Sequence, residues 1–168
     1  MQFVPWRSIA DWKCIGCGDC CRLYSVVINF NEWLNIVKGY GVEQTVSGLS
    51  ELYIKRGSDG SCAFLCSLPG SYRCGIQHMK PKACQLWPFK VFNAPMYGLA
   101  DKAEYMLGGG RLFIYADSMC NGLRFGNPTY DFAYHTVREF AEIALYLRKD
   151  QFWSTSKVNN LVRARLRF

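Results

Sequence analysis

Four cysteines lie within eight residues near the start of the chain, in the run Cys14-Ile-Gly-Cys-Gly-Asp-Cys-Cys21. Cys14, Cys17 and Cys20 follow a C-x2-C-x2-C pattern, in which each two-residue gap lets a tight loop bring successive sulfurs to one centre. Gly16 and Gly18 suit such a loop, because glycine adopts positive φ without strain. The spacing is close to that of the first three ligands in a bacterial ferredoxin run. No Cys-Pro follows three residues after Cys20, so a fourth ligand must come from elsewhere.

Cys21 follows Cys20 with no residue between them. In an extended backbone, adjacent side chains point to opposite faces. We therefore expect Cys21 to turn toward a second centre. Two other readings stay open at this point: a small apolar thiol in the core, or a strained disulfide with Cys20.

Five further cysteines follow, at Cys62, Cys66, Cys74, Cys84 and Cys120. They stand in a recognisable order of short motifs. These are Cys62-Ala-Phe64, Cys74-Gly-Ile76, Lys80-Pro-Lys-Ala-Cys84, the aromatic-proline pair Trp87-Pro88 and Cys120-Asn-Gly122. With the opening C-x2-C-x2-C-C run, this order resembles a cysteine-cluster family described as a zinc- or iron-chelating domain. The resemblance spans about Trp12 to Gly126. One departure is Lys80, where the family often has arginine; lysine keeps the positive charge but not the bidentate fork.

The resemblance implies a set of metal ligands and leaves Cys66 outside it. The set is Cys14, Cys17, Cys20, Cys21, Cys62, Cys74, Cys84 and Cys120. It allows two centres of four thiolates, or one such centre with structural thiols beside it. In the two-centre arrangement, the C-x2-C-x2-C cysteines hold one centre and Cys21 joins the distal cysteines at the other.

Zinc and iron–sulfur clusters both bind four thiolates. The C-x2-C-x2-C run is closer to cluster-binding sequences than to the paired C-x2-C of zinc ribbons. Distant relatives of the resembled family include flagellin lysine methylases that are thought to carry an iron–sulfur cluster. We therefore expect one or two iron–sulfur clusters of the [4Fe-4S] type, with zinc as the alternative cofactor. A protein-lysine methyltransferase is a further hypothesis from this resemblance alone, but no nucleotide-like cofactor motif accompanies it.

Other candidate sites are weaker. His78 lies between two of the cysteines and is a possible ligand, although a lone loop histidine is more often a surface group. His135 falls in a helical pattern, where packing or exposure to solvent explains it. Gly108-Gly-Gly110 indicates a hairpin turn, because no helix opens after it to bind a phosphate. No Ser/His/Asp arrangement, P-loop or dinucleotide fingerprint was found, and no catalytic residue is predicted.

Composition bounds the kind of protein and its surroundings. The chain has 168 residues, of which half are hydrophobic, and an odd number of cysteines, 9, which a purely disulfide framework would leave unbalanced. With no secretory signal and no membrane span evident, we expect a cytoplasmic protein. The net charge of +7 suits nucleic acid, but two four-thiolate centres would reduce it to about +3. A protein or redox partner, or nucleic acid at the basic segment 157–168, is expected; that segment also suits docking on the domain itself.

The elements expected to position the cysteines are short. The patterns predict strands at 24–30, 52–56, 62–65 and 89–92, a hairpin from 103–107 to 111–115, and short helices at 32–38 and 42–49. Asn31 is the expected N-cap of the helix at 32–38, and Gly39 and Gly41 are expected to end it. A longer amphipathic helix is predicted for 129–149. The fold class is therefore α+β: a loop-rich cysteine region at 1–126, followed by a helical region at 127–168 that packs on it as part of a single domain.

Overall fold

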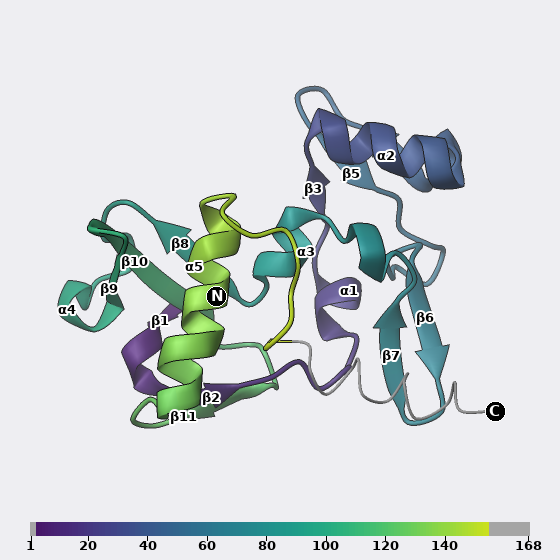
Figure 1. The fold of residues 1–168 in the computed structure, drawn as a ribbon. Coiled ribbons are helices and arrows are strands. Elements are labelled where there is room, and N and C mark those ends of the chain that lie inside the picture. Colours follow the sequence, from purple (N-terminus) through teal and green to yellow (C-terminus); the bar gives the residue numbers. More distant parts are fainter. Residues whose placement is uncertain (1–2, 155–168) are drawn as a thin grey trace. The chain divides into compact units, whose positions relative to one another are not determined.

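The computed structural model describes residues 3–154 (Figure 1). The chain divides into two units. The first joins Met1–Ile15 to Leu86–Phe168, and the second is the continuous segment Gly16–Gln85. The division expected from the sequence lies instead at residue 126, between a cysteine region at 1–126 and a helical region at 127–168. That division stays a prediction.

The first unit is built on an antiparallel sheet. Its longest strand is β10 (Gly110–Asp117), which pairs with β1 (Phe3–Pro5), β8 (Phe89–Phe92) and β9 (Glu104–Leu107). The last six residues of β10 are buried, which explains its unbroken apolar run. The predicted strand at 89–92 and the predicted glycine-linked hairpin are both confirmed.

A second strand pair in this unit carries the residues that flank two cysteines. Strand β2 (Ile9–Trp12) pairs antiparallel with β11 (Leu123–Phe125), and Trp12 lies opposite Leu123. Cys14 therefore follows the end of β2, and Cys120 precedes the start of β11. Two short helical elements, η1 (Trp6–Ser8) and α4 (Ala100–Ala103), complete the connections of the unit.

The predicted C-terminal helix is confirmed, although it is shorter than 129–149. A π-helical stretch, η4 (Phe132–Val137), continues into α5 (Arg138–Ala144), which is the long green helix of Figure 1. Its apolar face packs on the core of the unit. The rings of Phe140 and Phe89 lie 4.5 Å apart between centroids, and Trp12 meets Phe140 edge-on. The helix ends because Leu145 leaves helical geometry and Tyr146 has φ of 60°.

The second unit contains two small sheets and three helices. Strands β3 (Val27–Ile28), β5 (Leu52–Ile54) and β4 (Thr45–Ser47) form one antiparallel sheet in that order. Strands β6 (Leu65–Leu68) and β7 (Ser71–Cys74) form a hairpin. The helices are α1 (Asp19–Leu23), α2 (Phe30–Tyr40) and α3 (Lys82–Leu86), with the 3-10 turns η2 (Val42–Gln44) and η3 (Gln77–Met79).

The N-cap of helix α2 lies two residues before the predicted cap. The N-cap is Asn29, whose side chain accepts the N–H of Glu32 over 2.9 Å, while the Glu32 carboxylate accepts the N–H of Asn29 over 2.9 Å. The prediction of Asn31 as cap is therefore wrong, since this reciprocal capping box satisfies two backbone donors at once. The helix ends at Gly41, with φ of 93°, as expected, but the prediction that Gly39 also ends it is wrong, because the helix continues through Gly39 to Tyr40.

Two other predictions in this unit are wrong. The segment 42–49 is a single 3-10 turn followed by strand β4, because Thr45, Val46 and Ser47 pair with β5. The segment 62–65 is not a partner strand of β5. Cys62 forms only an isolated bridge with Arg56, and β3 and β4 occupy both edges of β5.

The α+β fold class is confirmed, with short strands, loop-rich cysteine segments and a C-terminal helix. None of the helices within residues 3–154 combines the length and hydropathy that crossing a membrane would require. The basic segment 157–168 falls outside the described residues.

Candidate metal centre

The loop before α1 has the conformation that its glycines predicted. Gly16 has φ of 68° and Gly18 has φ of 79°. A Cβ on Gly18 would lie 3.0 Å from the ring of Tyr72, so the loop needs glycine for space as well as for φ. Arg22 stacks over Tyr72 at 4.0 Å and donates to the carbonyl of Cys17 over 3.1 Å. These contacts hold Cys17 at the entrance of α1.

Cys20 and Cys21 both lie on helix α1, and their sulfur atoms are 3.9 Å apart. The expectation that they point to opposite faces assumed an extended backbone, and that assumption is wrong. Consecutive helical residues are about 100° apart around the axis, so neighbouring thiols can approach one another. No disulfide joins them, and all nine cysteines are free thiols in the structure.

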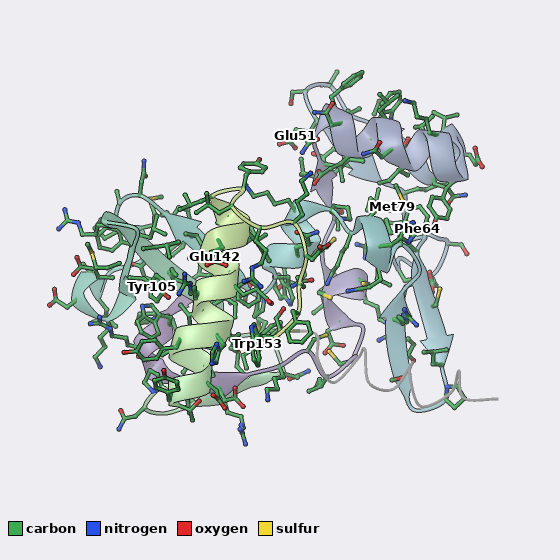
Figure 2. The ribbon with its side chains drawn as sticks, viewed as in Figure 1. Glu51, Phe64, Met79, Tyr105, Glu142 and Trp153 are labelled. Atoms are coloured by element: carbon green, nitrogen blue, oxygen red, sulfur yellow. The ribbon has the colours of Figure 1, made fainter. Side chains whose placement is uncertain are left out.

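Three distal cysteines of the second unit come toward this pair. The N–H of Cys62 donates to the carbonyl of Cys21 over 2.8 Å, which ties the two segments together. Cys74 ends strand β7, and Cys84 lies on α3. Cys21, Cys62 and Cys74 all belong to a core cluster built on Phe64 and Ile76; Figure 2 labels Phe64 and its neighbour Met79, which packs against the same cluster.

The pKa values show that these thiols influence one another. The pKa of Cys20 falls to about 7, because Cys21 donates a hydrogen bond to its thiolate and the Lys80 ammonium attracts the negative charge. The pKa of Cys21 is raised because its proton is held by the Cys20 sulfur and because burial disfavours its thiolate. Burial raises the pKa of Cys84 to about 12, and the thiolates of Cys74, Cys20 and Cys62 add to this rise.

Burial and neighbouring thiolates also raise the pKa of other thiols in the unit. Burial raises the pKa of Cys62 and Cys74, and in both the charge of Cys20 adds to the effect. Burial also raises the pKa of Cys17 to about 11, with further contributions from Asp19 and Cys20. A buried group of thiols that disfavour one another's ionisation is what a cation with two or more charges would relieve.

Lys80 is the common cation of the group. Its charge lowers the pKa of Cys20, Cys74 and Cys84 alike. The basic residue of the family motif is therefore positioned to favour thiolates, as expected from its place between Cys74 and Cys84.

Two predicted ligands, Cys14 and Cys120, lie in the first unit, in the loops that follow β2 and precede β11. The indole N–H of Trp12 donates to Sγ of Cys120 over 3.2 Å. The backbone N–H of Cys14 donates to the carbonyl of Ser154 over 3.1 Å. Both cysteines pack against the core cluster of that unit, which contains Trp12, Phe89 and Phe140. The two cysteines could be identified in the sequence. The hydrogen bond from Trp12 to Cys120 could not, because no sequence motif marks a tryptophan that donates to sulfur.

The turn before Cys120 is held by Asp117. The buried Asp117 carboxylate accepts the N–H of Met119 over 3.0 Å, and its carbonyl accepts the N–H of Cys120 over 3.2 Å. Gly122 lets the chain pass close to β2, because a Cβ there would lie 2.7 Å from the Lys13 carbonyl. These contacts explain the late C-x-G motif.

Three residues stood outside the predicted ligand set: Cys66, His78 and His135. Cys66 is exposed on β6, His78 is exposed on η3, and His135 stacks on Trp153 with ring centroids 4.4 Å apart. Within residues 3–154, no group of three or more His, Cys, Asp or Glu side chains is arranged to hold a single metal ion. The cysteines of the second unit are thus neighbours without converging on one point.

Comparison with known families agrees with the cysteine pattern. Residues 13–121, more than half of the chain, match the model of the CxxCxxCC family, described as "Putative zinc- or iron-chelating domain". All eight predicted ligands fall inside the matched range. No curated protein and no solved structure gives a significant match. The chain therefore belongs to the CxxCxxCC family of metal-chelating domains.

Proposed function

We propose that this protein binds an iron–sulfur cluster and uses it in electron transfer or in support of a redox reaction. The observation that carries the proposal is the gathering of Cys20, Cys21, Cys62, Cys74 and Cys84 from separate segments of the second unit. A partly buried set of thiols beside Lys80 is costly to ionise without a metal, and thiolates are the ligands that such clusters use. Cys14, Cys17 and Cys120 complete the proposed ligand set.

The spacing of the thiols supports a cluster. A single zinc ion with Zn–S bonds of about 2.3 Å draws its four sulfurs to within about 3.8 Å of one another. The Cys20 and Cys21 sulfurs lie 3.9 Å apart, but within residues 3–154 no three of the cysteines are arranged around a single ion. An iron–sulfur core is several ångströms across, so its thiolates lie further apart.

The surroundings suit a cluster that exchanges electrons. Phe64 and Ile76 are buried beside the thiols, and they would limit the access of water. Burial, net charge and hydrogen bonds to sulfur set the reduction potential of a cluster. A reducing cytoplasm, which keeps thiols from pairing as disulfides, is the compartment that this proposal expects.

Metal and sulfide analysis of protein purified without oxygen tests the proposal. We expect iron and acid-labile sulfide in equal amounts, about four of each for every [4Fe-4S] cluster, and a brown protein. Full occupancy by zinc with no sulfide would overturn it. Cys21→Ser then tests the number of centres: a loss of about half of the iron indicates two centres, and a complete loss indicates one.

A second candidate is a zinc-stabilised module that binds nucleic acid or a protein. The 3.9 Å separation of the Cys20 and Cys21 sulfurs favours it, since this is close to one edge of a zinc–thiolate tetrahedron. The net charge of +7 suits an acidic partner. A binding titration with single- and double-stranded nucleic acid at several salt concentrations tests whether the partner is nucleic acid. Affinity for nucleic acid should fall steeply as salt rises, because phosphate contacts weaken. No binding at low salt would exclude nucleic acid.

A further inference from the structure

Glu139 is a buried acid on α5 with an unusually complete set of donors. Its side chain has no exposed surface. Its Oε2 accepts the backbone N–H of Phe152 over 2.8 Å and of Trp153 over 2.9 Å. Its Oε1 accepts the N–H of Ser154 over 3.1 Å and the Ser154 hydroxyl over 2.6 Å. The Arg148 guanidinium lies 3.4 Å from Oε2.

A buried carboxylate is stable only where protein donors replace the hydrogen bonds that it would make to water. Each hydrogen bond to a charged acceptor is stronger than a neutral one, and an unpaired buried charge is costly. The three consecutive N–H groups of Phe152–Ser154 therefore turn around Glu139, and Ser154 is fully buried as a result. The end of the described chain is held in place by one side chain of α5.

The segment held by Glu139 contacts the first cysteine of the C-x2-C-x2-C run. The Ser154 carbonyl accepts the backbone N–H of Cys14 over 3.1 Å. Strand β2 ends at Trp12, so Cys14 has no partner in the sheet ladder to fix its backbone. The contact with Ser154 supplies that partner. Glu139, Ser154 and Cys14 thus form a continuous series of hydrogen bonds within the first unit.

We propose that Glu139 is a positioning residue for the metal ligand Cys14. Glu139 fixes Ser154, and Ser154 fixes the backbone of Cys14 in the conformation that presents its thiol. The inference rests on the proposed function, in which Cys14 is a ligand. Glu139 and Ser154 both lie beyond residue 121, where the family match ends. The C-terminal part of this chain would therefore contribute to a site that the family motif describes only through its cysteines.

The test compares Glu139→Gln with Glu142→Gln in the full chain loaded with its metal. Glu142 lies on the same helix, where it pairs with Arg138 and Arg148 and accepts nothing from Phe152–Ser154; Figure 2 labels it on α5. The readout is alkylation of each cysteine by iodoacetamide, followed by peptide mass spectrometry. A metal-bound thiolate is protected from alkylation, so the ratio of the Cys14 rates in the metal-free and metal-loaded forms of each variant reports the ligation of Cys14, apart from its burial and its thiolate fraction.

We expect Glu139→Gln to increase the alkylation rate of Cys14 by about tenfold, the size of one lost charged hydrogen bond. The other protected cysteines should keep their wild-type rates, and Glu142→Gln should match the wild type throughout. Unchanged protection of Cys14 in a folded Glu139→Gln protein would overturn the proposal. A wild-type protein whose thiols gain no protection on metal loading would instead refute the proposed function.

A milder variant covers the case in which Glu139→Gln does not fold. Ser154→Ala removes only the hydroxyl that donates to Glu139 over 2.6 Å. We expect a rise of about threefold in the alkylation rate of Cys14. Circular dichroism establishes which variants fold. If Glu139→Gln is unfolded, an unchanged rate at Cys14 in Ser154→Ala overturns the proposal.

Discussion

The indole N–H of Trp12 donates a hydrogen bond to Sγ of Cys120 over 3.2 Å. Trp12 is almost fully buried, and its ring also packs against Phe89 and Phe140. Trp12 thus packs in the core of the first unit and also donates a hydrogen bond to a predicted metal ligand. A donor fixed in this way favours negative charge on the sulfur.

Trp12→Phe should therefore shift the reduction potential of the loaded protein. Loss of a donor to a thiolate disfavours the more negative, reduced state, so we expect a more negative potential in a redox titration. Stability should fall by about 1–3 kcal/mol in urea denaturation. Trp33→Phe is the control, because the Trp33 N–H donates to Thr45 Oγ1 and not to sulfur. Equal potentials in both variants and the wild type would contradict the role of Trp12.

Cys20 should react faster than Cys84 in the metal-free protein near neutral pH. Its pKa is lowered to about 7, whereas the pKa of Cys84 is raised to about 12. Thiolate is the reactive form, so the alkylation rate at Cys20 should fall as the pH drops below about 7 and level off above it. Cys84 should stay slow across this range. Pulse alkylation of the metal-free protein with tandem mass spectrometry measures both, and equal rates would show that Cys20 lacks the stabilisation given by Cys21 and Lys80.

Gly18→Ala should disturb the loop that carries Cys17. The left-handed conformation costs an L-residue about 1–2 kcal/mol. The new Cβ would also press on Tyr72 at 3.0 Å. Gly70→Ala is a matched control, because Gly70 has φ of 75° with nothing within 4 Å of its Cβ. Chemical denaturation should show the larger loss for Gly18→Ala, and metal analysis should show lower occupancy in that variant alone.

Glu32 should affect both helix α2 and the segment that carries Cys84. Its carboxylate closes the capping box with Asn29 and accepts the Lys82 N–H over 2.7 Å. Asn29→Ala removes the cap alone and should cost about 1 kcal/mol. Glu32→Ala also leaves Lys82 without this acceptor, and should cost about 1–2 kcal/mol more. Thermal unfolding of the two variants, with metal content beside it, tests the difference; identical losses would mean that the Lys82 contact contributes nothing.

Cys66→Ser should leave the metal content unchanged, whereas Cys74→Ser should lower it. Cys66 is exposed on β6, and Cys74 is partly buried at the end of the neighbouring strand β7. The two variants alter the same hairpin by the same chemical change, so they separate ligation from folding. Loss of metal in Cys66→Ser would place Cys66 in the ligand set and require a new assignment.

The sequence predicted the parts of this molecule that depend on local patterns. The hairpin around Gly108 and the strand at 89–92 follow from turn chemistry and short runs rich in aromatic and aliphatic residues. The positive φ of Gly16 and Gly18 was foreseen from the short gaps between cysteines. The helix α1 was missed because five residues carry too little periodic signal, and its formation depends on surrounding contacts.

Two further features were not predicted from the sequence, and only one of them has a signal in it. Asn29 and Glu32 stand three residues apart, which is a capping-box signal that could have located the start of α2. Glu139 had no such signal, because an acid in an amphipathic helix is usually exposed. Only the packed structure shows that Phe152, Trp153 and Ser154 direct their N–H groups toward it.

The pairing of β1 with β10 has a consequence for the order of events during synthesis. Strands β1 and β2 precede the segment Gly16–Gln85 in the chain, whereas their partners β10 and β11 follow it. Every strand of the segment Gly16–Gln85 has its partner within that segment. Since nascent chains fold as their partners become available, the segment with most of the cysteines can complete its pairing while the first strands are still without theirs. Under the proposed function, delivery of metal to those thiols would not have to wait for the synthesis of β10 and β11.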